Sequence, residues 1–131
     1  MADTNTILAT WPYAWAYFYP TILLVNAILT FTPAAHAICE QGGFPQPRNE
    51  PLNTYVYLFA GCQLMLGLAV AILEYAGEWR AVSVILASAT PMGVIGTSLS
   101  GMNGFDQAFW THVVMFTIGT SASVSLVREY W

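Results

Sequence analysis

The sequence predicts an all-α integral membrane protein, in which four antiparallel transmembrane helices form an up-down bundle. Composition is the first reason. Of 131 residues, 56% are hydrophobic and 8% are charged, and the net charge is −4. Soluble domains carry roughly a quarter charged residues, so this composition excludes an ordinary soluble enzyme. The acidic balance also argues against a nucleic-acid partner, which would need a basic patch.

The spacing of the charges is the second reason. No Asp, Glu, Lys or Arg occurs in 4–39, 51–73, 81–105 or 107–127. A helix needs about 20 apolar residues to cross the roughly 30 Å hydrocarbon core of a bilayer, so each gap has room for one span. Amphipathic helices that would cover the buried helices of a soluble protein are missing. We therefore expect residues 1–131 to form a single four-helix transmembrane domain.

The first two spans are expected at about 15–34 and 54–75. Aromatic rings, which favour the headgroup level of a membrane, crowd the start of the first span at Trp11, Tyr13, Trp15, Tyr17, Phe18 and Tyr19. Pro20 lies inside that span, where a membrane helix tolerates it as a kink. The second span follows Pro51 and stops at Gly77, which suits a helix end.

The last two spans are expected at about 81–99 and 106–127. Pro91 lies near the middle of the third. Asp106 is placed to cap the free N–H groups of the fourth. Arg128 suits the C-terminal end of that helix, because a cation there complements the helix dipole.

The link over 36–53 is the one long connection, and its prolines and the Gly42-Gly43 pair predict turns without regular structure. Short links elsewhere favour antiparallel neighbours. Four spans place Arg80 and Arg128 on the side of both termini and Arg48 on the other. Positive residues favour the cytoplasmic side, so we expect both termini in the cytoplasm.

Two alternatives concern the first loop. Ala35-x-Ala37 follows an apolar run and matches a signal-peptide cleavage site; cleavage would leave three helices. The absence of Lys or Arg ahead of that run favours a segment that stays attached. Cys39 and Cys62 could pair only if the loop dipped inward, because a disulfide needs Cα atoms within about 7 Å. The simpler interpretation is one loop thiol and one small buried hydrophobe.

Polar residues at membrane depth are the candidate functional groups, because they are costly unless they face the bundle interior or a wet cavity. We expect a pocket that opens to the face opposite the termini, with Gln63 and His112 at its bottom. His112 is the candidate acid–base group, with Glu40 and Asp106 as its partners. The candidate substrate-binding residues are Asn26, Gln63, Asn103 and Trp110.

Helix packing is the competing interpretation of several polar and small residues. Ala89, Gly93 and Thr97 form one stripe at a spacing of four, with Gly96 and Ser100 beside it. Thr117, Ser121 and Ser125 form another, with Gly119 and Ser123 beside it. Small residues of this kind let membrane helices approach closely. Two histidines and two cysteines lack the spacing of a zinc or haem site, so neither a metal nor a cofactor is expected.

The sequence of the second and third predicted helices resembles that of a known family. The matching runs are Leu58-Phe59-Ala60-Gly61-Cys62-Gln63-Leu64-Met65-Leu66-Gly67-Leu68-Ala69 and Tyr75-Ala76-Gly77-Glu78-Trp79-Arg80-Ala81-Val82. They resemble small, mostly fungal four-helix membrane proteins catalogued as a domain of unknown function. The resemblance covers about 55–127, and its matching positions are Cys62-Gln63, Gly67, Gly77 with Arg80, and His112. The chain departs from the family at Cys62, where an arginine is frequent, and has no acidic residue inside the third helix.

This resemblance implies a tailoring role in fungal secondary metabolism at the endoplasmic reticulum, by analogy of fold and context. The first hypothesis is a cofactor-free isomerase or cyclase acting on a lipophilic polyketide or terpenoid. The second is a non-catalytic accessory or scaffold protein of such a pathway, and the third is a small transporter. The expected partners are the lipid bilayer, a lipophilic small molecule, and either further copies of the chain or other biosynthetic enzymes.

Overall fold

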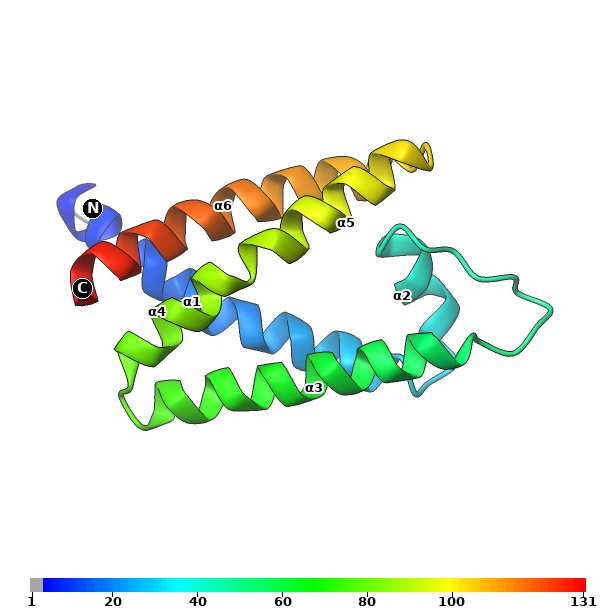
Figure 1. Ribbon diagram of the computed structural model, residues 1–131, viewed down its shortest axis with the longest axis horizontal. Coiled ribbons are helices and arrows are strands. Elements are labelled where there is room, and N and C mark those ends of the chain that lie inside the picture. The colour runs from blue at the N-terminus through cyan, green and yellow to red at the C-terminus, as the bar shows by residue number, and fades with distance from the viewer. Residues whose placement is uncertain (1–3) are drawn as a thin grey trace.

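The computed structural model describes residues 4–131, and every regular element within that range is a helix (Figure 1). This confirms the all-α prediction. The elements are α1 Thr4–Leu29, α2 Ala35–Gln41, α3 Thr54–Tyr75, α4 Trp79–Ser88, α5 Thr90–Met102 and α6 Asp106–Tyr130.

Three helical stretches are long and apolar enough to cross a membrane: Thr54–Tyr75, Trp79–Met102 and Asp106–Tyr130. They are consistent with a multi-pass membrane protein. The first of them is α3, whose ends coincide with the predicted second span. The last is α6, which starts at the predicted residue and continues three residues beyond 127.

The N-terminal helix differs from the predicted 15–34 at both ends. It already includes the aromatic segment before Trp15, and it stops at Leu29. The stop has a local cause, because Pro33 has no N–H to donate to the Leu29 carbonyl. The hydroxyl of Thr32 donates to that carbonyl instead, at 2.7 Å.

The link over 36–53 contains a helix, so the prediction of turns throughout it was wrong. Ala35–Gln41 forms the seven-residue α2, a length too short to show helical periodicity in the sequence. The helix ends at the Gly42-Gly43 pair. Gly43 has φ +82°, a left-handed conformation that glycine adopts without steric cost.

The predicted third span is two helices, α4 and α5, which meet at Ala89. Pro91 stands in the first turn of α5. Because proline has no N–H, it cannot bond to the Ala87 carbonyl one turn earlier, and its ring crowds that turn. The two helices consequently follow different directions (Figure 1).

Helix capping also differs from the prediction at the start of α6. Phe105 occupies the cap position and no side chain caps the helix; Asp106 lies in the first turn. Its carboxylate still lies near the positive end of the helix dipole. At the start of α3, by contrast, the Asn53 side chain accepts a 2.9 Å hydrogen bond from the N–H of Tyr55.

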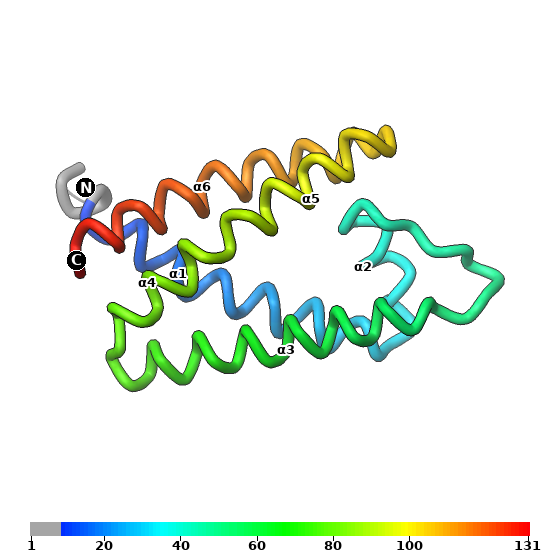
Figure 2. Tube along the Cα trace, viewed as in Figure 1, coloured from blue at the N-terminus to red at the C-terminus, as the bar shows by residue number. Residues whose placement is uncertain are grey.

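Two helix pairs dominate the packing: α1 packs on α3, and α5 packs on α6. Figure 2 shows the coloured start of α1, the C-terminus and the α3–α4 turn at one end of the molecule, which we call the end that holds the termini. At the other end, which we call the loop end, lie α2, the link to α3 and the α5–α6 turn. The buried core lies near the termini and consists of Ala16, Val70, Val82, Leu86 and Leu126.

Glycines set the closest helix contacts. A Cβ on Gly67 would lie 3.2 Å from the Pro20 carbonyl oxygen, and one on Gly93 would lie 2.6 Å from the Phe116 ring. The predicted packing role of Gly93 is therefore confirmed. The stripe of Thr117, Ser121 and Ser125 behaves differently. Thr117 and Ser121 are exposed. Gly119 and Ser123, which were predicted to pack beside them, do face inward: Ser123 is buried, and a Cβ on Gly119 would lie 2.9 Å from the Trp15 ring.

Candidate functional site

His112 connects α6 to the first loop. Its Nε2 atom lies 3.2 Å from the carbonyl oxygen of Gly42, a residue 70 positions earlier in the chain. The half-buried ring lies over Gly96 of α5, where an added Cβ would be 3.6 Å from Nδ1. Because a carbonyl oxygen only accepts, this bond requires the proton on Nε2. In the neutral ring, Nδ1 is then a proton acceptor.

The Gly42-Gly43 turn packs beside His112, one of the two residues predicted to lie at the bottom of an open pocket. Gly43 is buried, and a Cβ there would clash with Ser100 Oγ and lie 3.3 Å from the Cβ of Ala108. The absence of a side chain on Gly43 therefore lets the turn reach both α5 and α6. Beneath it, Cys39 of α2 is buried, and burial raises the pKa of its thiol.

The two carboxylates predicted to assist His112 lie on the surface. Glu40 pairs with Arg48 at 3.0 Å, with both side chains more than half exposed. Asp106 is exposed in the first turn of α6. Within residues 4–131, no hydrogen bond or ion pair joins either carboxylate to His112. The three predicted catalytic residues therefore share one end of the molecule without forming a bonded cluster.

The predicted substrate-binding residues also lie apart. Asn26 of α1 and Gln63 of α3 are half-buried. The Asn103 amide donates to the Leu99 carbonyl at 2.9 Å, which completes the last turn of α5. Trp110 is 62% exposed and makes an edge contact with Phe109. Asn103 and Trp110 therefore face outward.

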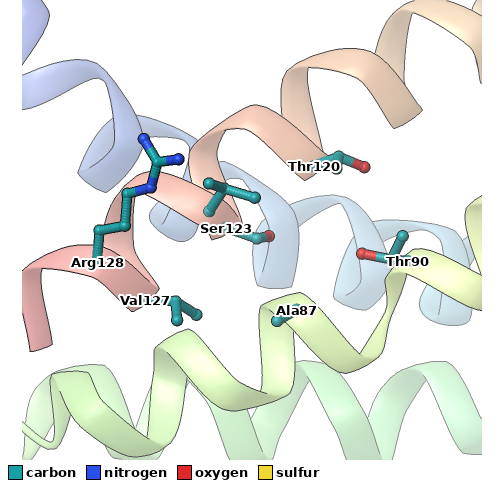
Figure 3. Close-up of a pocket in the computed structure, with 7 residues that line it drawn as sticks. Ala87, Thr90, Thr120, Ser123, Val127 and Arg128 are labelled. Carbon is teal, nitrogen blue, oxygen red and sulfur yellow. The ribbon is translucent and has the colours of Figure 1, made fainter. Parts of the chain in front are cut away.

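The structure also contains a hollow lined by residues of α4, α5 and α6 (Figure 3). Its volume is about 330 Å³, and it lies between the α4–α5 break and the second half of α6. Its polar lining residues include Thr90, Thr120, Ser123 and Arg128. The Oγ1 atom of Thr120 is buried without a hydrogen bond in the described part of the chain. Sequence reasoning missed this hollow, although Pro91 marked the break that creates it.

Comparison with protein-family models, curated proteins and solved structures found no match for the chain. The resemblance to the fungal four-helix family therefore stays a prediction. Both cysteines are free. Among residues 4–131, no group of three or more His, Cys, Asp or Glu side chains is placed to hold a metal ion.

Proposed function

We propose that four segments of the chain cross a membrane as an antiparallel bundle: α1, α3, α4 with α5, and α6. The 26 residues of α1 correspond to about 39 Å at 1.5 Å per residue, and none of them is charged. Arg80 lies in the first turn of α4 and Arg128 in the last turn of α6, whereas Arg48 lies in the link between α2 and α3. The start of α4 and the end of α6 lie at the same end of the molecule, and that link lies at the loop end (Figure 1). The positive-inside rule favours the cytoplasm for the end with two arginines.

Within this membrane, we propose that the protein acts as a non-catalytic accessory component that binds another membrane protein. One observation carries this proposal: two of the three predicted catalytic side chains, those of His112 and Glu40, are used in structural contacts. His112 binds the loop carbonyl, and Glu40 pairs with Arg48. Neither lines the hollow beside the α4–α5 break.

The outward face of α6 supports a partner helix. Thr117 and Ser121 are exposed one turn apart inside a candidate membrane span. Their hydroxyls donate to the carbonyls four residues earlier, at 2.8 Å each. Small hydroxyl residues are typical of helix contacts in membranes, where they allow close backbone approach. Among residues 4–131, no helix covers these two side chains.

Site-directed crosslinking tests the partner surface. A single cysteine at position 121, in a Cys39→Ser, Cys62→Ser background, should crosslink to a neighbouring membrane protein in native membranes. A cysteine at position 65 is the matched control, because Met65 is 68% exposed on α3, away from α6. Equal crosslinking from the two positions would contradict a specific partner at α6.

Gene deletion in the source organism tests the accessory role. Loss of an accessory protein should lower the yield of a lipophilic product without accumulation of a new intermediate. Loss of an enzyme should instead cause its substrate to accumulate. The lipophilic product and the endoplasmic reticulum follow from the family resemblance alone, and both stay predictions.

A cofactor-free isomerase or cyclase is the second candidate, and the geometry of His112 favours it. With Nε2 bonded to Gly42, Nδ1 is the nitrogen that would exchange a proton with a substrate. His112→Gln separates the two roles, because its amide can still donate to the carbonyl but cannot act as an acid or base. If His112 only docks the loop, Gln should preserve function where Ala does not. A catalytic His112 would make both variants inactive, typically by about 10²–10⁴-fold.

A further inference from the structure

The hollow beside the α4–α5 break is a groove with an apolar wall. The groove arises because the helix is interrupted at Ala89, where α4 ends and α5 begins, while α6 runs past this break without interruption (Figure 3). The side chains that face the gap are too small to fill it; they include Ala87, Thr90, Thr120 and Val127. The result is a space of about 330 Å³ inside a candidate membrane span.

Arg128 supplies the charge at one end of this groove. It lies in the last turn of α6 and is exposed. The other two arginines have partners: Arg80 stacks on the Trp131 ring at 3.7 Å, and Arg48 pairs with Glu40. Within residues 4–131, Arg128 has no ion pair. Its guanidinium is therefore available to an anion at the mouth of the groove.

The dimensions select the size of the occupant. Thr120 lies eight residues before Arg128 on α6, which is about 12 Å along the helix axis. The volume is near the lower end of the roughly 300–1,000 Å³ typical of small-molecule sites. A small ring system or the first part of one hydrocarbon chain fits this length, and the remainder of a long chain would extend past Thr120. The volume has room for one chain and not for the two chains of a bilayer lipid.

We propose that this groove binds a single-chain lipophilic acid. Its carboxylate is held by Arg128, and its hydrocarbon chain lies along α6 toward Thr120. An arginine matches a carboxylate with two parallel N–H donors. Such charge-assisted bonds are roughly twice as strong as neutral ones, so an uncharged chain of equal length binds less tightly. This site does not depend on the partner surface at Thr117 and Ser121.

Native mass spectrometry of the protein in an uncharged detergent tests the proposal with three probes: palmitate, 1-hexadecanol and dioleoyl phosphatidic acid. Wild type should retain one palmitate per chain in preference to the other two. Arg128→Gln should weaken palmitate binding at least about tenfold, the loss expected for a hydrogen bond to a charged group. Arg80→Gln is the matched control and should bind palmitate as wild type does.

A second variant tests the groove without changing charge. Ala87→Phe should fill the space and lower palmitate binding, while circular dichroism shows unchanged helix content. Undiminished palmitate binding by Arg128→Gln, or equal binding of hexadecanol and palmitate by wild type, would overturn the role of the carboxylate. Preferential retention of phosphatidic acid would overturn the single-chain ligand and point to a bilayer lipid.

Discussion

Gly43→Ala tests how the first loop closes the loop end of the molecule. The substitution carries two penalties. Gly43 has φ +82°, and the left-handed region costs a residue with a Cβ about 1–2 kcal/mol. The new methyl group would also clash with Ser100 Oγ and lie 3.3 Å from the Cβ of Ala108. Overpacking of this kind typically costs about 1–3 kcal/mol, so we expect a total loss of about 2–5 kcal/mol.

Gly104→Ala separates the two penalties. Gly104 has a similar φ of +71°, but no atom lies within 4 Å of an added Cβ. This control should lose only the conformational term, about 1–2 kcal/mol. Adding Ser100→Ala to Gly43→Ala should restore part of the difference, because it removes the clashing hydroxyl and leaves the Ala108 contact.

The assay is SDS-induced unfolding of protein purified in a mild detergent, followed by the helical circular dichroism signal. The free energy of unfolding is compared among wild type, the two glycine variants and the double variant. Equal losses for Gly43→Ala and Gly104→Ala would show that the turn does not pack on α5 and α6. That result would also remove the structural role assigned to His112.

Three further predictions concern other contacts. Gly67→Ala should lower the free energy of unfolding by about 1–3 kcal/mol, because the new Cβ would lie 2.9 Å from Leu24. The control Gly61→Ala meets open space and should not be destabilising. Equal losses in the same SDS titration would contradict the close α1–α3 contact. Tyr13→Phe should cost about 1 kcal/mol by removing hydrogen bonds to two α6 side chains, at 2.6 and 2.7 Å; an unchanged SDS midpoint would argue against them. Burial raises the pKa of the Cys39 thiol and so lowers its thiolate fraction. In a Cys62→Ser background at pH 7.5, iodoacetamide should therefore modify Cys39 more slowly in folded than in unfolded protein. Equal rates would contradict the buried position.

The sequence by itself determined the class of the protein and most of the helical segments. Charge-free runs of about 20 residues are a local property, because each residue in hydrocarbon must be tolerated by the membrane. Both ends of α3 and the start of α6 were predicted correctly for this reason. The end of α1 was misplaced, because Pro33 ends the helix inside an apolar run that hydropathy alone extends.

Only the tertiary structure decided which residues meet. The bond between His112 and Gly42 joins positions 70 residues apart, and no local pattern specifies such a partner. Helical periodicity places Thr117 and Ser121 on one face of α6, but it cannot tell whether that face meets a neighbouring helix or the surroundings. The groove beside Ala87 likewise depends on the direction α5 takes after the break. Pro91 marks where the chain bends, and the packing of α5 on α6 determines what the bend leaves open.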